Sequence, residues 1–154
     1  MFYNRDFGNL SRKIEVMVKE NMPVEQRLPV ITDILWEGLK DQGLAWVGFY
    51  KIAEDEKEML LVCRQHKPAC SPIGLHGVCG KAWKEKKAQI VPDVHALGKD
   101  HIVCDPANRS EVVIPLIDKD GQCRCVLDLD SRELNAFGPE DVAGLELVLQ
   151  SAGL

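Results

Sequence analysis

Two pairs of apolar segments, each joined by a short polar connection, constrain the fold of this chain more than any other feature. Residues 45–52 (AWVGFYKI) and 59–64 (MLLVCR) are rich in aromatic and β-branched residues, and the acidic run EDEKE lies between them. Residues 111–117 (EVVIPLI) and 124–130 (RCVLDLD) are joined by the turn sequence DKDGQ. Because parallel strands need a much longer connection, we expect both pairs to form antiparallel strands.

Helical patterns flank these strands. Apolar residues recur every three or four positions over residues 23–40, and Gly43 follows where a helix is expected to stop. A weaker helix is predicted at about residues 10–20, and a short one begins near Gly77. A last helix follows Pro139, because proline favours the first turn of a helix and acidic residues favour its positive end.

The remaining segments are predicted to be mostly irregular. Residues 66–78 hold two prolines and two glycines, which disfavour both helix and strand. Residues 89–94 form a short strand that ends at Pro92, and residues 95–110 form a long loop. Because long loops inside compact domains are usually functional, this loop is a candidate for function.

The order of these elements predicts an α+β fold, in which helices pack on a central antiparallel sheet. A chain of 154 residues is long enough to bury the core of one compact domain. We therefore expect a single domain over residues 1–154, with an N-terminal helix at about residues 10–20 and a core at about residues 24–154.

Composition excludes two classes of partner. The formal net charge of −5 argues against a nucleic-acid surface. No apolar stretch approaches the length of a membrane span, and the N-terminus lacks the apolar stretch of a secretory signal. We therefore expect no nucleic acid, no membrane partner and a cytoplasmic location. The sequence leaves the oligomeric state open, with a homodimer among the options.

Six cysteines are more than the core of a cytosolic protein of this size needs. In that compartment cysteines more often bind metal or react than cross-link a fold. Cys70 and Cys104 lie in predicted loops and Cys79 lies at a predicted helix start, where side chains can meet solvent. The other three lie in or beside the apolar strand patterns and are interpreted as structural: Cys63, Cys123 and Cys125.

Three interpretations of the loop thiols remain open. In the first, they are small buried side chains, a frequent role of free cysteine. In the second, they bind zinc together with histidines, although no Cys-x-x-Cys pair is present. In the third, one thiolate attacks a substrate and a second thiol resolves the oxidised product. The histidines available for the second interpretation are His66, His76, His95 and His101.

The redox interpretation needs a thiol that ionises readily. A helix N-terminus or a nearby cation lowers the pKa of a thiol below its usual value of about 8.5. Cys79 has the predicted helix start, and Cys104 has His101 and Arg109 in its own loop. Asp105 lies next to Cys104 and opposes formation of the thiolate.

Three acidic residues are placed to converge. Asp128 and Asp130 are two positions apart on a predicted strand, so their side chains point to one face, and Glu111 begins the neighbouring strand. Crowded carboxylates raise one another's pKa, so one can stay protonated and donate a hydrogen bond while the others hold a cation. Such a cluster suits a small zwitterion with an ammonium group and a polar oxygen. The alternative is a set of solvated acids at a strand end.

Two aromatic residues share a face of the first predicted strand. Trp46 and Tyr50 lie four positions apart, and Gly48 between them leaves room on the same face. Aromatic residues in such positions are core residues or line a small apolar pocket. Both readings of this pair remain open.

Six motifs then resemble one family. WVGFY, KPAC, GVCG, PDVHA, HIVCDPANRSEVVIPL and VLDLDS occur in this order, from about residue 24 to the C-terminus. They are similar to those of the free methionine-(R)-sulfoxide reductases, single-domain enzymes with the GAF fold. The resemblance implies a GAF-like α+β domain that reduces free L-methionine-(R)-sulfoxide to L-methionine through a cysteine sulfenic acid and an intramolecular disulfide. It also implies thioredoxin as the reductant and no metal or organic cofactor.

The resemblance assigns roles to individual residues. The cysteine of the HI-x-CD motif, here Cys104, is the nucleophile of the family. The cysteine of KPAC, here Cys70, is its main resolving thiol, and that of GVCG, here Cys79, is a second one. The residues implied to enclose the methyl thioether, the sulfoxide oxygen and the amino group of the substrate are Trp46, Tyr50, Asp93, Glu111, Asp128 and Asp130.

The sequence departs from the family pattern in two places. The segment between Cys70 and Cys79 is one residue shorter than usual, which leaves open which of them resolves the oxidised nucleophile. Cys125 stands where the family has glycine, and it either crowds the sheet or adds a reactive thiol. Two other functions remain as alternatives, a GAF-type small-molecule sensor without turnover and a zinc-binding interaction module.

Overall fold

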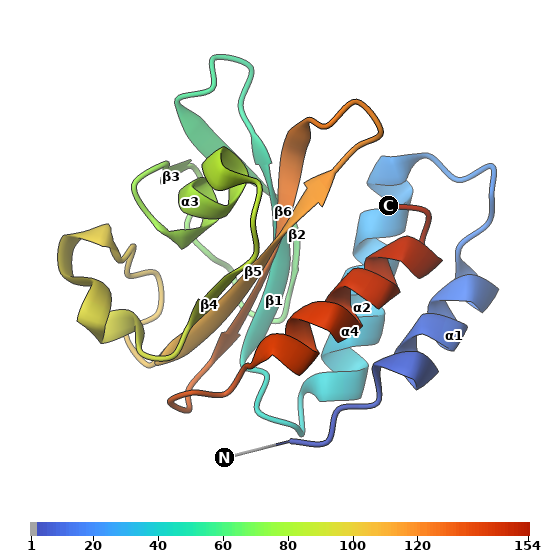
Figure 1. Cartoon of the computed structure of the whole chain (residues 1–154), viewed down its shortest axis with the longest axis horizontal. Coiled ribbons are helices and arrows are strands. Elements are labelled where there is room, and N and C mark those ends of the chain that lie inside the picture. The colour runs from blue at the N-terminus through green and yellow to red at the C-terminus, as the bar shows by residue number, and fades with distance from the viewer. Residues whose placement is uncertain (1–2) are drawn as a thin grey trace.

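A six-stranded sheet forms the centre of the molecule, shown in Figure 1 as a computed structural model that describes residues 3–154. The strands are β1 (Trp46–Ile52), β2 (Glu58–Gln65), β3 (Ile73–Gly74), β4 (Gln89–Val91), β5 (Ser110–Ile117) and β6 (Cys123–Ser131). Their order across the sheet is β3-β2-β1-β6-β5-β4, and every neighbouring pair is antiparallel. The predicted antiparallel pairs β1–β2 and β5–β6 are therefore confirmed. The first two residues of the predicted domain lie outside the described part.

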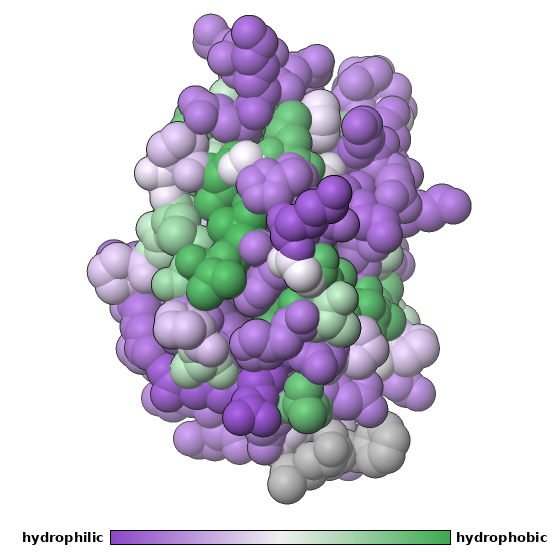
Figure 2. Space-filling view, turned by 90° about the vertical axis from the view of Figure 1, so that its left-hand side faces the viewer, coloured by the Kyte–Doolittle hydropathy of each residue, from purple (hydrophilic) through white to green (hydrophobic). Residues whose placement is uncertain are grey.

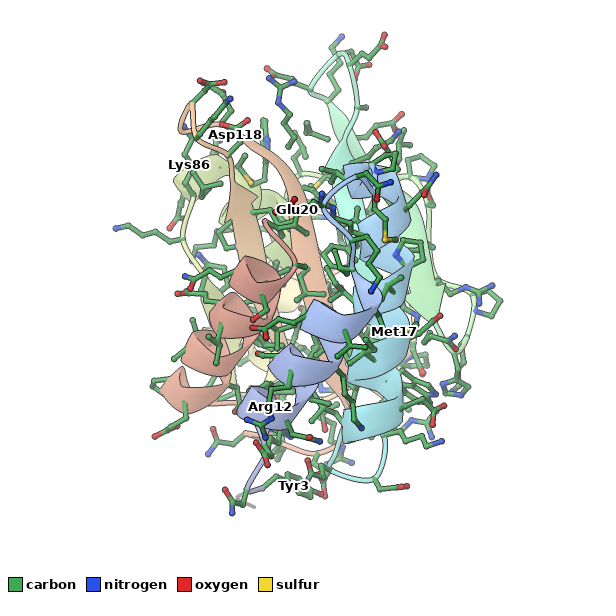
Figure 3. The ribbon with its side chains drawn as sticks, turned by 90° about the vertical axis from the view of Figure 1, so that its right-hand side faces the viewer. Tyr3, Arg12, Met17, Glu20, Lys86 and Asp118 are labelled. Carbon is green, nitrogen blue, oxygen red and sulfur yellow. A yellow bond between two sulfur atoms is a disulfide. The ribbon has the colours of Figure 1, made fainter. Side chains whose placement is uncertain are left out.

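Five helical segments cover the two faces of this sheet. They are α1 (Phe7–Met17), α2 (Val24–Leu39), α3 (Val78–Glu85), the 3₁₀ segment η1 (Val94–Asp100) and α4 (Pro139–Ser151). Helices α1, α2 and α4 lie together on one face (Figure 3), whereas α3 and η1 lie on the other (Figure 1). This arrangement confirms the predicted α+β architecture. Over the described residues, no helix is both long enough and apolar enough to span a membrane.

The alternation of β1 divides its apolar side chains between two cores. Val47 and Phe49 are fully buried in the larger core, which α1, α2 and α4 complete. Trp46 and Tyr50 are buried on the opposite face, in a smaller core that includes residues of α3. Because successive side chains of a strand point to opposite faces, one strand serves both cores.

Strand β6 repeats this division with acidic side chains on one face. Leu127 and Leu129 are buried in the larger core beneath the three helices. Val126 belongs to the smaller core, and the alternation places Asp128 and Asp130 on that same face. The two acidic side chains of β6 thus lie on the side that carries α3 and η1.

The N-terminal helix begins and ends about three residues earlier than the predicted range of about 10–20. Asp6 precedes α1, and its side-chain Oδ1 accepts a hydrogen bond from the backbone N–H of Asn9 at 3.0 Å. This cap satisfies one of the free N–H groups at the helix start. At the other end Val18 is extended, which stops the helix at Met17.

Two segments predicted to be irregular contain short regular elements. In the segment 66–78, β3 pairs with β2 through Ile73 and Met59, both of which are buried in the smaller core. In the loop predicted at 95–110, η1 takes up the first part, and its start is capped by Asp93. Both elements depend on partners distant in sequence or on a side-chain cap, so local composition did not reveal them.

Candidate active site

A small cavity of about 80 Å³ lies on the face of the sheet that carries α3 and η1. Strands β1, β3, β5 and β6, helix α3, the start of η1 and the segments 67–69 and 101–108 supply its lining. Figure 2 shows apolar side chains gathered in a band between polar ones on this side of the molecule. The predicted site residues that line the cavity are Trp46, Tyr50, Cys79, Cys104, Glu111, Asp128 and Asp130.

A disulfide joins Cys70 to Cys104 beside this cavity. The two cysteines lie 34 positions apart in the sequence, and their Cα atoms are 5.7 Å apart. Cys104 lines the cavity, and Cys70 directly follows the lining segment 67–69. The shortened segment between Cys70 and Cys79 therefore does not keep Cys70 from reaching Cys104. Of the two candidate partners left open by the sequence, the structure bonds Cys70.

The two aromatic residues of β1 hold the segment that carries Cys70. Trp46 donates a hydrogen bond from Nε1 to the Lys67 carbonyl oxygen at 3.0 Å, and the Tyr50 hydroxyl donates to the Cys70 carbonyl oxygen at 2.8 Å. The ring centroids of Trp46 and Tyr50 are 6.2 Å apart and tilted by 35°. Burial raises the pKa of the Tyr50 hydroxyl, so it remains a donor. The pair thus forms an apolar wall and also positions the disulfide.

Gly48 does not leave empty room between these rings. A Cβ atom at this position would clash with the Trp46 indole and lie 2.8 Å from the carbonyl oxygen of Cys63. The indole therefore fills the space that the glycine provides. The two rings share one face, as the alternation along the strand predicts, and one of them takes up the room at Gly48.

Cys79 is buried and surrounded by acids. It is the second residue of α3, and its side chain lines the cavity next to Asp128. Burial raises the pKa of the Cys79 thiol, and the Asp128 carboxylate raises it further. These effects outweigh the helix N-terminus. The expectation that the helix start lowers the pKa of Cys79 is therefore wrong.

The three predicted acids meet at one end of the cavity. Glu111 on β5 pairs directly with Asp130 on β6, and Asp128 follows on the same face. Burial raises the pKa of all three carboxyls, and the neighbouring carboxylates raise it further. The predicted crowding of carboxyls is confirmed, and the cluster retains protons where isolated acids would be ionised.

Two buried side-chain oxygens in the cavity have no hydrogen-bond partner among the described residues, Asp128 Oδ1 and Asn108 Oδ1. Buried polar atoms are nearly always paired, so an unpaired acceptor that lines a cavity is suited to a donor from a ligand. Sequence analysis missed Asn108, because nothing in the pattern DPANRS separates a ligand-facing amide from an ordinary loop residue. Asn108 lines the same cavity as the three carboxyls because of the tertiary fold, which its local sequence does not reveal.

The charge of Asp105 beside Cys104 is compensated by two cations. Asp105 Oδ2 lies 3.4 Å from Lys67 Nζ and 3.7 Å from Arg132 Nη2. A hydrogen bond from the Ala107 backbone N–H lowers the pKa of Asp105, and Lys67 lowers it further. Asp105 is thus ionised but partly neutralised, which weakens its opposition to a Cys104 thiolate. Sequence analysis also missed Lys67, which lines the cavity.

His101 does not supply the positive charge expected near Cys104. It lines the cavity, and its ring centroid lies 6.0 Å from that of His95. Burial lowers the pKa of His101, and His95 lowers it further. The imidazole is therefore neutral at neutral pH, and the cations shown beside this segment are Lys67 and Arg132, which both contact Asp105.

Asp93 lies outside the set of cavity-lining residues. Its Oδ1 accepts a hydrogen bond from the backbone N–H of His95 at 3.0 Å and caps η1. His95 Nδ1 lies 3.6 Å from the same oxygen. The structure therefore places Asp93 at a helix start, and its predicted contact with substrate has no support from this geometry.

The three cysteines interpreted as structural do not line the cavity. Cys63 Sγ lies 3.4 Å from Thr32 Oγ1, and Cys123 Sγ donates to the Cys125 carbonyl oxygen at 3.4 Å. Cys125 packs against the larger core, on the face opposite the cavity. Burial raises its pKa to about 12, so it is a protonated thiol and not the reactive one that the departure from the family pattern allowed.

The histidines do not assemble with the loop cysteines. His66 stacks on Trp36 with ring centroids 4.6 Å apart, and His95 packs against His101. Among the described residues, one group of ligand-type side chains could hold a metal ion, and it contains no histidine. Its members are Cys79, Glu111 and Asp128, whose ligand atoms lie within 4.8 Å of one another. The mixed Cys and His zinc site weighed from the sequence is therefore not formed.

Comparison with known proteins places this geometry in a family. The sequence matches the GAF domain family over residues 21–154. It is 36% identical over 147 residues to the free methionine-R-sulfoxide reductase of Escherichia coli, covering 94% of this chain and 85% of that protein. It is 37% identical over 119 residues to the protein of the same name from Saccharomyces cerevisiae, covering 75% and 66%. An X-ray structure of free methionine-R-sulfoxide reductase from Neisseria meningitidis, in complex with its substrate, superposes with a TM-score of 0.85 at 33% identity, covering 99% of this chain and 92% of that one.

The sheet order, the helices on both of its faces and the matched region together define a GAF domain. Within this class, the chain belongs to the free methionine-R-sulfoxide reductase family. The resemblance that six short motifs indicated is thereby confirmed over most of the chain.

Proposed function

We propose that this protein reduces free L-methionine-(R)-sulfoxide to L-methionine, with Cys104 as the nucleophile. The observation that carries the proposal is the position of Cys104, which lines a cavity with three crowded carboxyls and is bonded to a second cysteine, Cys70. A thiol that attacks an oxidised sulfur becomes a sulfenic acid, which a neighbouring thiol can convert to a disulfide. The relatives from Escherichia coli and Saccharomyces cerevisiae bear the name of this activity.

The lining of the cavity suits the parts of this substrate. The methyl and thioether groups pack against the rings of Trp46 and Tyr50. The ammonium group donates to the carboxyl cluster, where Asp128 Oδ1 is a buried acceptor without a partner. The carboxylate group takes the side of Lys67, a cation in the same lining. The ammonium group thus meets acidic side chains, and the carboxylate group meets a cation, so neither charge is buried without a partner.

The chemical step moves one oxygen atom from substrate to enzyme. A protonated carboxyl of the cluster donates a hydrogen bond to the sulfoxide oxygen, which makes the sulfur more electrophilic. The raised pKa of Glu111, Asp128 and Asp130 keeps such a proton available near neutral pH. The Cys104 thiolate attacks the sulfur and the carboxyl proton passes to the oxygen. The bond between that oxygen and the substrate sulfur breaks as the oxygen is transferred to Cys104, and methionine leaves. Sulfur of the substrate gains two electrons, and Cys104 becomes a sulfenic acid.

The enzyme then returns to its reduced form in two steps. Cys70 attacks the Cys104 sulfenic sulfur, so that a disulfide forms and water leaves. Thioredoxin, a dithiol, reduces that disulfide by thiol exchange. The expected cytoplasmic location fits this route, because thiol systems there keep proteins reduced. Cys79 is the alternative resolving thiol, but its burial and raised pKa favour Cys70.

The same lining explains why a free amino acid would be preferred over a methionine sulfoxide residue in a protein. In a polypeptide both charged ends are replaced by peptide bonds, and a single amide N–H cannot supply the charge or the several donors that an ammonium group offers to the buried acceptors Asp128 Oδ1 and Asn108 Oδ1. An unpaired buried acceptor costs about 1–3 kcal/mol. The cavity thus selects against the longer substrate by charge as well as by size.

A coupled assay tests the proposal. Protein, free methionine-(R)-sulfoxide, thioredoxin, thioredoxin reductase and NADPH are mixed, and NADPH loss is followed. We expect turnover in the wild type and in Cys125→Ser, whose thiol faces the opposite core, and none in Cys104→Ser. The (S)-epimer and N-acetylated substrate serve as controls. Wild-type NADPH loss no greater than that of Cys104→Ser would remove the enzyme hypothesis.

A further inference from the structure

The catalytic disulfide leaves one thiol in the cavity. Cys79 is buried and lines the same space as Cys104, but the Cys70–Cys104 bond does not include it. Its Sγ, a Glu111 carboxylate oxygen and an Asp128 carboxylate oxygen lie within 4.8 Å of one another. Asp128 is 5% exposed, and its Oδ1 is buried without a hydrogen-bond partner. An unpaired buried oxygen beside a thiol and a second carboxylate points to a cationic ligand.

We propose that Cys79, Glu111 and Asp128 form a binding site for a zinc-type divalent metal ion, and that this ion occupies the cavity in place of the substrate ammonium group. Binding itself goes beyond the proposed function, since it needs no turnover. Only the competition with substrate rests on that function.

The chemistry of the three ligands selects the metal. Mg²⁺ and Ca²⁺ prefer shells of oxygen, whereas zinc accepts sulfur and oxygen together. Zinc bonds of about 2.3 Å to sulfur and 2.0–2.2 Å to oxygen place tetrahedral ligand atoms about 3.6 Å apart. The observed spread of up to 4.8 Å is close enough for side-chain adjustment alone. Three protein ligands leave the fourth position for water, as in open zinc sites.

The proton balance of binding is simple. Coordination converts the Cys79 thiol to a thiolate and releases its proton to solvent, together with any proton held by the two carboxyls. No oxidation or reduction is involved. The dication also neutralises the acids and so removes their mutual repulsion. Without the ion, these carboxyls avoid that repulsion by remaining protonated.

Cobalt binding to the oxidised protein isolates this site. With Cys70 and Cys104 held in the disulfide, Cys79 is the cavity-lining thiol that remains. Titration with Co²⁺ should give one equivalent of bound metal with a thiolate-to-cobalt charge-transfer band, and Zn²⁺ should bleach it while Mg²⁺ should not. Cys79→Ser should abolish the band and weaken binding about tenfold or more, since even neighbours of metal ligands contribute that much.

Matched variants decide between this site and other thiols. Cys125→Ser, which removes a thiol from the opposite face of the sheet, should keep the band unchanged. Glu111→Gln retains Cys79 and should weaken cobalt binding. This second variant tests the site if Cys79→Ser fails to fold. A band that survives Cys79→Ser, is lost in Cys125→Ser, or is absent from the oxidised wild type overturns the proposal.

Competition is tested with the amino acid itself. L-Methionine should displace Co²⁺ from the oxidised protein more effectively than D-methionine, which chelates the free metal equally well. Equal effects of the two enantiomers would overturn the shared cavity while leaving the metal site intact. Absence of NADPH-coupled turnover in the wild type would instead reject the proposed function and leave the cobalt result standing.

Discussion

Individual carboxyls in the cavity are held where burial disfavours their charge. Glu111, Asp128 and Asp130 all have a raised pKa for this reason. In the unfolded chain they ionise near pH 4, whereas in the fold they ionise at higher pH. Above about pH 4 the unfolded state therefore binds fewer protons than the folded state, so stability falls as the pH rises through the folded pKa values. Burial of these carboxyls thus lowers the stability of the fold above about pH 4.

Asp128→Asn tests this cost. The amide keeps the shape of the side chain but cannot ionise, so we expect the variant to be more stable than the wild type at pH 7, by on the order of 1 kcal/mol, the usual size of a single-substitution effect. In a thermal melt this is a rise of roughly 2–4 °C. The difference should vanish below about pH 4, and turnover should fall sharply. A variant less stable than the wild type at pH 7 would contradict the argument.

The two resolving candidates differ in how they are placed. Cys70 is bonded to Cys104, and Cys79 is buried beside Asp128. In Cys70→Ser, reduced enzyme without external reductant should still release about one methionine per chain, because Cys104 needs no partner for the first step. The product should be a Cys104 sulfenic acid, detected by mass spectrometry after trapping with a dimedone-type reagent. Rapid formation of a Cys79–Cys104 disulfide instead would assign the resolving role to Cys79.

Among the elements, helix α3 lies close against the segment that precedes it, and a glycine makes this approach possible. A Cβ atom on Gly80 would clash with the backbone carbonyl of Leu75, which belongs to the segment between β3 and α3. The contact is with backbone, so no side chain can move to relieve it. This close approach brings Cys79, the preceding residue, into the cavity beside the acids of β6.

Gly80→Ala should therefore displace α3. We expect a loss of about 1–3 kcal/mol in the free energy of unfolding, as for overpacking elsewhere, with a marked loss of turnover. Gly8→Ala in α1 is the matched control, because its Cβ would meet only side-chain atoms at 3.5 and 3.6 Å. Denaturant unfolding and the NADPH assay measure both effects. Equal behaviour of the two variants would show that α3 is free to shift.

On the scale of the whole molecule, one arginine ties the N-terminal segment to the rest of the domain. Arg5 Nη1 lies 2.8 Å from Asp141 Oδ1 in α4 and donates to the Ala136 carbonyl oxygen at 2.9 Å. Arg5 Nη2 donates to the Gln42 carbonyl oxygen at 2.7 Å, just after α2. The side chain of Arg5 is 2% exposed, so this pair is a buried one.

Arg5→Ala should destabilise the protein by roughly 3–5 kcal/mol, because it leaves the buried Asp141 carboxylate without its partner. Arg12→Ala, on the exposed side of α1 (Figure 3), should change stability by less than about 0.5 kcal/mol. Urea denaturation of both variants provides the comparison. A small effect in Arg5→Ala would mean that α1 docks mainly through its apolar side chains.

Much of this architecture could be predicted from local patterns. The β1–β2 and β5–β6 pairs, α2 and α4 all lie within a few residues of their predicted positions. Their signals are periodic apolar residues and turn sequences, which act over short distances in the chain. The two-residue strand β3 and the segment η1 escaped prediction, because the first depends on pairing with β2 and the second on the cap from Asp93.

For the site, the sequence by itself determined which chemical groups are available. Alternation along β1 and β6 was enough to place Trp46 with Tyr50 and Asp128 with Asp130, because the side-chain period of a strand is local. Register between β5 and β6 then adds Glu111. The six motifs determined the family through the combination of these short signals.

Only the tertiary structure decided how those groups behave. It bonded Cys104 to Cys70, buried Cys79 among carboxyls, made Asp93 a helix cap and turned Lys67 and Asn108 toward the cavity. The physical reason is that a pKa, a disulfide or an unpaired oxygen depends on distances between residues far apart in the chain and on exclusion of water. Neither quantity is encoded in the spacing of residues along a single segment.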